Sequence, residues 1–213
     1  MSGLPGVLVC GCRKYEEYLR AALRRLRNPN WILVGLVGST DVSAAVWDEK
    51  SRIVTLPVPD TYEALPTKIH AAFTFASLKW PDAPGIYKTD DDIVYPSIPL
   101  LAGAIQKYKD EPFWGLFVGA CPAADVSPMR IAHRFDDKTL TPRHQEAIYC
   151  YGHGYWVGRA AIPAILAAGD EYRSSYLEDV ATGYVLNQAG FTPKRLPLLY
   201  SELPRGPALL NHV

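Results

Sequence analysis

The chain has 213 residues, which is enough for one domain with a sizeable hydrophobic core or for two small domains. Its 22 basic residues balance its 22 acidic residues, so no net charge attracts the protein to nucleic acid or to an anionic membrane surface. No apolar run approaches the roughly 20 residues of a membrane-spanning helix, and residues 1–5 do not begin a signal peptide. We therefore expect a soluble protein with no membrane segment in this chain.

The first ninety residues alternate short apolar runs with helical patterns. Helices are predicted over Lys14–Arg27 and Pro66–Lys79, where apolar residues recur at helical spacing. The first helix carries a basic run that we expect to be a solvated face, at Arg20, Arg24, Arg25 and Arg27. Buried strands are predicted at Gly6–Cys10, Ile32–Gly38, Arg52–Leu56 and Gly85–Thr89. This alternation indicates an α/β fold with a mostly parallel central sheet and helices on both faces.

The second half of the chain is less regular. Ser97 is a predicted N-cap for a helix that continues to about residue 109. Residues 122–147 have little periodicity and are typical of a long functional loop. Strands are predicted over Trp114–Ala120 and Tyr149–Val157, and helices at about 159–168 and 178–189, ended by Gly169 and Gly190. Because no repeat and no linker is visible, residues 1–213 are predicted to form a single domain.

Three adjacent aspartates, Asp90, Asp91 and Asp92, follow the strand predicted at residues 85–89. In parallel α/β sheets, ligands bind beyond the carboxyl ends of the strands, which is where these residues fall. Residues two apart on an extended segment face the same way, so Asp90 and Asp92 can share one ligand while Asp91 points elsewhere. Two hard oxygen donors suit Mg²⁺ or Mn²⁺, which can also hold a nucleotide diphosphate. An acidic turn with solvated charges is the alternative, and the position after a buried strand favours the metal site.

Four segments, in order along the chain, resemble motifs of the β-1,3-galactosyltransferase and fringe-like glycosyltransferases. Residues 60–68, DTYEALPTK, resemble that family's D-x-Y-x-x-L-x-x-K stretch. Residues 87–93, YKTDDDI, match its Y-x-K-x-D-D-D-V segment closely. Residues 149–155, YCYGHGY, are similar to its Y-P-x-Y-x-x-G-x-G-Y segment, and residues 178–183, EDVATG, match its E-D-V-x-x-G segment.

The resemblance implies the GT-A fold, with about residues 1–95 as the nucleotide-sugar-binding half and about residues 96–213 as the acceptor and catalytic half. It implies a metal-dependent hexosyltransferase that transfers sugar from a UDP-sugar to a hydroxyl of a glycan or glycoprotein, with inversion and usually with Mn²⁺. Asp90 and Asp91 are then expected at the nucleotide, and Asp92 with Asp90 at the metal. Asp179, or otherwise Glu178, is implied as the general base. The enzyme is expected to be cytoplasmic, a domain of a longer protein, or virus-encoded.

Three further residues are candidates for the donor or the metal. Lys68 and Arg13 could meet the phosphates of the nucleotide, although a cation on a helix surface is the plainer interpretation. His212 could be a third metal ligand, because GT-A enzymes often supply a histidine near the C-terminal end of the domain. A histidine next to the last residue can equally belong to a frayed terminus.

The sugar and the acceptor also have candidate contacts. Gly152, His153 and Gly154 would let the backbone and an imidazole approach a sugar closely, or they form a tight turn with an exposed His153. Trp156, like Trp114, could stack on a sugar ring, although aromatic residues in strands more often belong to the core.

Glu178 and Asp179 open a predicted helix, where carboxylates are favourable for electrostatic reasons alone. Inversion, however, requires a base for the acceptor hydroxyl, and a carboxylate on a separate element across the cleft suits that role.

Other functions remain open from the sequence. A retaining GT-A transferase or a sugar nucleotidyltransferase would use the same acidic segment, and the anomeric configuration of the product or the release of pyrophosphate would distinguish them. A non-catalytic carbohydrate-binding domain is a third possibility. The complete aspartate triplet and the intact Glu178–Asp179 pair argue against it.

Overall fold

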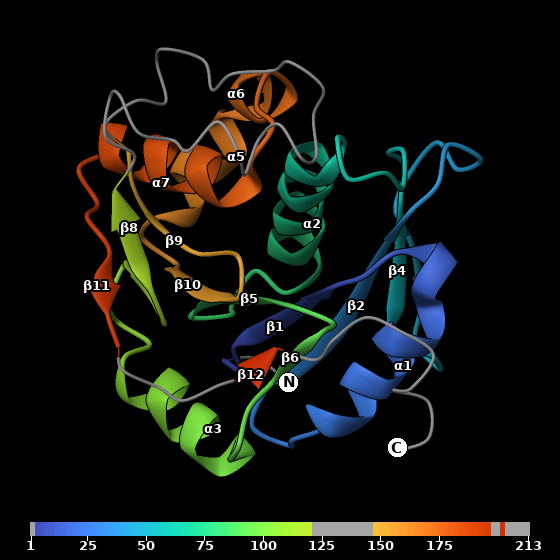
Figure 1. Ribbon diagram of the computed structural model, residues 1–213, viewed down its shortest axis with the longest axis horizontal. Helices are drawn as coiled ribbons and strands as arrows, with labels where there is room; N and C mark the ends of the chain where they lie inside the picture. Colours follow the sequence, from blue (N-terminus) through green and yellow to red (C-terminus); the bar gives the residue numbers. More distant parts are fainter. Residues whose placement is uncertain (1–2, 121–146, 197–200, 203–213) are drawn as a thin grey trace.

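The computed structural model describes residues 3–120, 147–196 and 201–202 of the chain (Figure 1). Its centre is an eight-stranded sheet. In spatial order the strands are β11 (Lys194–Arg195), β7 (Phe113–Gly115), β10 (Gly154–Gly158), β5 (Gly85–Asp90), β1 (Gly6–Cys10), β2 (Ile32–Gly38), β4 (Ile53–Leu56) and β3 (Val46–Asp48). The four neighbours β5, β1, β2 and β4 are parallel, whereas β10 and β3 run antiparallel to the strands beside them.

Helices cover both faces of this sheet, as the sequence predicts (Figure 1). On one face lie α2 (Leu65–Lys79), α5 (Ile162–Ala167), α6 (Gly169–Arg173) and α7 (Glu178–Gln188). The 3₁₀ turn η1 (Arg13–Tyr15) leads into α1 (Glu16–Arg25), which lies with α3 (Ile98–Lys107) on the other face. A separate apolar core fills each face, because strands such as β1 are buried on both sides. The predicted α/β class, with a mostly parallel central sheet, is confirmed.

Two predicted strands are each divided in the structure. The segment predicted at 114–120 splits into β7 and β8 (Val118–Ala120), and the segment predicted at 149–157 splits into β9 (Ile148–Cys150) and β10. While β7 and β10 pair within the large sheet, β8 and β9 pair with each other in a small separate sheet. The chain leaves the large sheet at Leu116 and returns to it through Gly152. At both places the alternation of inward and outward side chains along the strand is interrupted.

The helix predictions hold with one correction. Ser97 caps α3 through a hydrogen bond from the Leu100 N–H, and Gly190 ends α7 with a positive φ of 84°. Gly169 does not end a helix: it is the first residue of α6, which follows α5 after a single residue. The short pairing of β6 (Ile93–Val94) with β12 (Ser201–Glu202) was not predicted, and neither were β3 and β11, because strands of two or three residues carry no readable period.

The predicted long loop at residues 122–147 lies almost entirely outside the described residues. No helix in the described parts of the chain is both long enough and apolar enough to cross a membrane.

Gly183, the last residue of the E-D-V-x-x-G motif, lies where α7 packs against β9. A Cβ at this position would lie 2.4 Å from the Cβ of Tyr149 and 2.7 Å from the carbonyl oxygen of Ile148. We expect Gly183→Ala to lower the free energy of unfolding by about 1–3 kcal/mol, because backbone would have to shift. Gly103→Ala in α3 is the control, since an added Cβ there meets nothing within 4 Å. It should stabilise the helix by up to about 1 kcal/mol. Urea denaturation measures both, and equal midpoints would contradict this account of Gly183.

Candidate active site

The candidate site lies at the carboxyl edge of the parallel strands. Asp90 is the last residue of β5 and stands opposite Cys10, the last residue of β1. Asp91 and Asp92 form the turn between β5 and β6. The aspartate triplet therefore occupies the edge at which ligands of such sheets bind.

The three aspartates have different environments. Asp90 is partly exposed, and its Oδ1 lies 2.8 Å from the Nζ of Lys88. Asp92 is also partly exposed. Asp91 is only 2% exposed and packs against Gly11, while its carbonyl oxygen accepts a hydrogen bond from Arg25. Asp91 thus points away, as expected from the strand geometry, but its buried carboxylate gives no surface for the predicted nucleotide contact.

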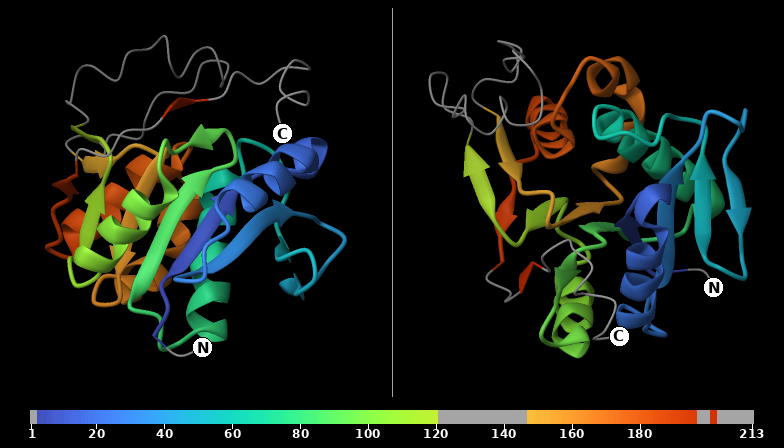
Figure 2. Two further views of the ribbon diagram at one scale, coloured as in Figure 1. Left: turned by 90° about the horizontal axis from the view of Figure 1, so that it is seen from below. Right: turned by 45° about the vertical axis from the view of Figure 1, so that its right-hand side comes forward.

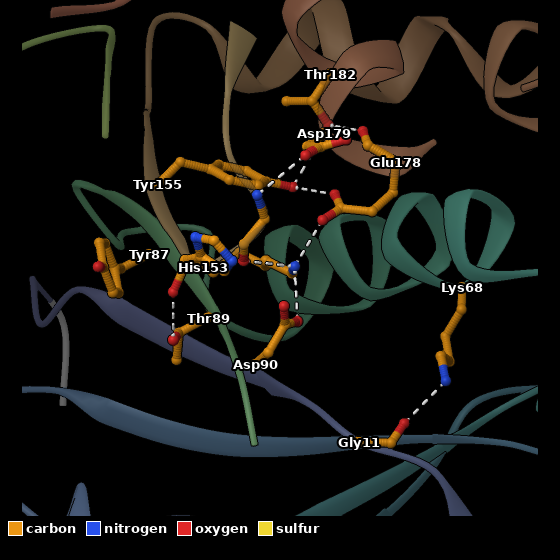
Figure 3. A network of polar contacts seen from close by, with 12 residues as sticks. Gly11, Lys68, Tyr87, Thr89, Asp90, His153, Tyr155, Glu178, Asp179 and Thr182 are labelled. Carbon is orange, nitrogen blue, oxygen red and sulfur yellow. Dashed lines mark hydrogen bonds and ion pairs between the residues drawn. The ribbon is translucent and has the colours of Figure 1, made fainter. Parts of the chain in front are cut away.

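Lys88 is the centre of a buried polar network. Figure 3 labels Asp90, Tyr155, Glu178 and Asp179 among the residues of this region. The ammonium group of Lys88 has no exposed surface and donates to Gly152 O at 2.8 Å, and it forms ion pairs with Asp90 at 2.8 Å and Glu178 at 2.6 Å. These three partners use all three N–H bonds of the ammonium group. Burial alone would lower the pKa of Lys88, but the charges of Asp90 and Glu178 raise that pKa well above its ordinary value. Lys88 therefore ties the acidic end of β5 to the first residue of α7.

Glu178 is the buried counter-ion in this network. One carboxylate oxygen accepts from Lys88, and the other accepts from the hydroxyl of Tyr155 at 2.7 Å. Burial raises the pKa of Glu178 to about 7, and the positive charge of Lys88 opposes that rise. With both oxygens paired and only 4% of the residue exposed, Glu178 has no free face toward an acceptor hydroxyl. The geometry leaves Asp179 as the stronger candidate for the base.

Asp179 lies in the first turn of α7 and is partly exposed. Its Oδ2 accepts a hydrogen bond from the Gly152 N–H at 3.1 Å, and its Oδ1 accepts one from the Val180 N–H at 2.9 Å. Burial raises the pKa of Asp179, while Lys88 and the two backbone hydrogen bonds lower it. A carboxylate that is fixed in position, partly exposed and less acidic than usual has the properties of a general base.

The Gly152–His153–Gly154 turn packs tightly over the network. An added Cβ would lie 2.9 Å from Glu178 Oε1 if it were on Gly152, and 2.1 Å from the Tyr87 hydroxyl if it were on Gly154. The His153 carbonyl oxygen accepts hydrogen bonds from Thr89 and Tyr95. The His153 ring is half-buried, since it stacks on Tyr151 with the ring centroids 6.0 Å apart. Packing therefore explains both glycines, and a sugar contact by His153 stays a prediction.

Lys68 is a buried residue, which corrects the interpretation as a surface cation. It is 3% exposed, and its Nζ donates to Asp60 Oδ1 and to Gly11 O, both at 2.8 Å. Asp60 also accepts from the Gly38 N–H at 2.9 Å. The Asp60–Lys68 pair of the first motif thus joins the ends of β1 and β2 to α2, and the ammonium group is not presented to a phosphate.

Arg13 is exposed and lies at the same edge of the sheet. Its guanidinium group donates to the Thr55 hydroxyl at 3.1 Å and to Gly38 O at 3.4 Å. These partners lie at the carboxyl ends of β4 and β2, so the Arg13 guanidinium group is accessible at this edge for the predicted contact with a phosphate.

The remaining predictions concern the tryptophans as sugar contacts and His212 as a metal ligand. Trp156 and Trp114 have no exposed surface, and their rings stack on each other with centroids 6.1 Å apart. Both residues therefore belong to the core, and neither ring is accessible for the predicted stacking on a sugar. His212 lies outside the described residues. Within the described ranges, no group of three or more His, Cys, Asp or Glu side chains could hold a metal ion.

The sequence motifs do not reveal the roles of Lys88 and Tyr155. The two residues stand opposite each other on β5 and β10, and both are fully buried. A lysine inside an otherwise apolar strand was the available signal, because lysine is almost never fully buried unless it is paired.

The sheet order and its acidic edge define a GT-A-like α/β domain. The chain belongs to the galactosyltransferase family, whose sequence pattern matches residues 26–197. It is therefore a glycosyltransferase domain, as the resemblance indicated. No curated protein sequence gives a significant match.

Two solved structures align with this chain over most of both chains. The 4-diphosphocytidyl-2C-methyl-D-erythritol synthase of Anaerococcus prevotii is 12% identical, with 91% of this chain and 86% of that chain covered and a TM-score of 0.49. Mouse xyloside xylosyltransferase 1 in its apo form is 11% identical, with 91% and 85% covered and a TM-score of 0.41. At these TM-scores, neither likeness supports an argument about function.

Proposed function

We propose that this domain transfers a hexose from a UDP-sugar to a hydroxyl group of a glycan or glycoprotein, with inversion and with a divalent cation. One observation carries the proposal. Lys88 links Asp90, at the predicted donor edge, to the helix that begins with Glu178 and Asp179, so that a donor site and a candidate base share one buried network. Residues 1–95 would bind the nucleotide sugar, and residues 96–213 would supply the acceptor side and the base.

Asp90 and Asp92 are the residues that would hold the cation. Mg²⁺ and Mn²⁺ prefer oxygen ligands, and Mg²⁺ is usually bound by one or two carboxylates together with substrate phosphates and water. Both aspartates are partly exposed, Asp90 at the end of β5 and Asp92 in the turn after it, so they can be reached from solvent. When bound there, the cation would supply positive charge to the leaving diphosphate. Arg13 would add a second positive group at the same edge.

Asp179 would take the proton of the acceptor hydroxyl. The acceptor oxygen then forms its bond to the anomeric carbon while the bond from that carbon to the diphosphate oxygen breaks, and UDP leaves. Attack on the side opposite the leaving group inverts the anomeric carbon. The Gly152 N–H donates a hydrogen bond to Asp179 and so orients it, and the Gly152 carbonyl oxygen accepts a hydrogen bond from Lys88. The position of the base therefore depends on the buried lysine.

A panel of nucleotide sugars with Mn²⁺ tests the proposed function. We expect one UDP-sugar to bind in a metal-dependent manner and to release UDP slowly without an acceptor and faster with one. Release of pyrophosphate from a nucleoside triphosphate and a sugar phosphate would instead identify a nucleotidyltransferase. A product with the donor's anomeric configuration would identify a retaining enzyme. Sugar binding without turnover of any donor would identify a carbohydrate-binding domain.

Asp92→Ala should abolish metal-dependent binding of the donor. Its carboxylate is the predicted principal ligand of the cation, so calorimetric titration of UDP in Mn²⁺ should give the same weak affinity as titration with a chelator. Asp82→Ala is the control, because Asp82 is an exposed aspartate outside the site. If Asp92→Ala bound UDP as tightly as the unaltered protein and still required Mn²⁺, the assignment of this ligand would be wrong.

A further inference from the structure

A hollow of about 430 Å³ lies between α1 and the turn that joins β3 to β4. Figure 2 shows α1 side by side with this edge of the sheet. Two leucines, Leu23 and Leu33, are among its lining residues. Its charged lining consists of Arg20, Arg24, Arg27, Glu49, Lys50 and Arg52.

Two separate segments bring these cations together. Arg20 and Arg24 are four residues apart, which places them on one face of α1, and Arg27 follows two residues after the end of this helix. Lys50 and Arg52 come from the β3–β4 turn. That turn is fixed, because Asp48 accepts hydrogen bonds from the Lys50 N–H at 3.0 Å and from the Ser51 hydroxyl at 2.6 Å. Arg52 adopts a positive φ of 59°, and its carbonyl oxygen is bound by the Gly35 N–H.

Among the described residues, part of this positive charge is not balanced locally, although Glu16 and Asp48 interact with Arg20. The lining holds five cations and one carboxylate, in a chain whose overall formal charge is zero. Arg20 pairs with Glu16 at 2.5 Å. Within residues 3–120, 147–196 and 201–202, the side chains of Arg24, Arg27, Lys50 and Arg52 have no hydrogen bond or ion pair. The predicted solvated helix face is therefore one wall of a hollow in which like charges converge, and an anion would relieve their repulsion.

We propose that this hollow binds a ligand bearing phosphate groups. Arginine side chains match the geometry of phosphate oxygens through paired N–H groups, and four of the five cations are arginines, two of them on α1. A volume of about 430 Å³ is that of a small-ligand pocket and exceeds the space needed by one phosphate group. The same chemistry is presented by a soluble polyphosphate and by the head group of an anionic phospholipid.

The hollow is distinct from the proposed donor site. Leu33 is opposite Val7 of β1, whereas Asp90 is opposite Cys10, three residues further along that strand. This separation is about 10 Å along the strands, and two further strand spacings separate β5 from β2. Binding here would need neither the cation nor Asp179.

Binding of two probes, with a chelator present, tests the proposal. Inorganic tripolyphosphate is titrated by calorimetry, and vesicles of phosphatidylcholine with phosphatidic acid are compared by flotation with vesicles of phosphatidylcholine alone. The chelator removes divalent cations, so the probes cannot be held through a metal at the donor site. The double variant Arg24→Gln/Arg27→Gln should lose about tenfold or more in affinity, since charge-assisted hydrogen bonds are lost. The control Arg159→Gln/Arg173→Gln removes the same charge from exposed arginines elsewhere and should bind as the unaltered protein does.

Each outcome decides the proposal. Binding of tripolyphosphate alone would identify a soluble ligand, binding of phosphatidic acid vesicles alone would identify a head group, and either result supports the site. Equal losses in the two double variants would show a response to net charge only and would overturn it, as would no binding of either probe by the unaltered protein. Arg24 and Arg27 make no ion pair with the residues that the structure describes, so their variant should keep its thermal stability and its sugar transfer.

Discussion

Replacing Asp179 with Asn is expected to lower the rate of sugar transfer by about 10²- to 10⁴-fold, the contribution typical of a general base. Asn is nearly isosteric, and its side-chain oxygen can still accept the hydrogen bond that the Gly152 N–H donates to Asp179, while the local bond from the Val180 N–H is given up. The fold and the affinity for the UDP-sugar should therefore be unchanged. Steady-state transfer assays and calorimetric titration of the donor measure the two effects separately.

Asp82→Asn is the matched control for this variant, because the same substitution is then made at an exposed aspartate outside the site. It should retain full transfer activity. If Asp179→Asn also retained normal turnover, Asp179 would not be the base, and Glu178 would be the next residue to test.

The pH profile gives a second check on Asp179. Burial raises the pKa of this carboxyl group, and Lys88 only partly opposes the rise. A base is inactive once it is protonated, and a raised pKa means that protonation begins at a higher pH. Transfer by the unaltered protein should thus decline on acidification while the pH is still above the ordinary range of an aspartate. The residual activity of Asp179→Asn should lack this decline.

Replacing Lys88 with Met is expected to lower the free energy of unfolding by about 3–5 kcal/mol, because it leaves a buried charge without its partner. Glu178 is 4% exposed and would keep only the hydroxyl of Tyr155 as a side-chain donor. Urea denaturation measures the loss. Lys79→Met, at an exposed lysine at the end of α2, is the control and should change stability little.

A double variant separates the lost ion pair from simple loss of packing. Adding Glu178→Gln to Lys88→Met removes the unpaired charge, so the double variant should be more stable than Lys88→Met alone. If the double variant were less stable by the full sum of the two single effects, the ion pair would not be the cause.

The pH dependence of Lys88→Met should have a definite sign. Burial already raises the pKa of Glu178 to about 7, and removal of Lys88 takes away the charge that opposes this rise. The folded variant then holds a proton that the unfolded chain, with an ordinary glutamate pKa, has released. Its stability should accordingly be greatest at low pH and should fall as the pH rises from the ordinary glutamate range to above 7.

Several features of the fold could be predicted because they depend on neighbours in the sequence. The apolar runs of β1, β2 and β5 and the helical spacing of α2 set element types by their own period. The position of the triplet follows directly, since Asp90 comes at the end of a buried strand in a parallel sheet. The divided strands at 114–120 and 149–157 could not be predicted, because their partners are chosen by contacts between distant segments.

By itself, the sequence determined the α/β class, the acidic edge of the sheet and the start of α7 at Glu178. Only the tertiary structure decided which of these groups meet. Lys88 and Glu178 are 90 residues apart in the chain and 2.6 Å apart in space, and Arg24 of α1 lies across a hollow from a turn that begins after Asp48. Local periodicity fixes which way a side chain points from its own strand or helix. What it meets there depends on the register and packing of another element.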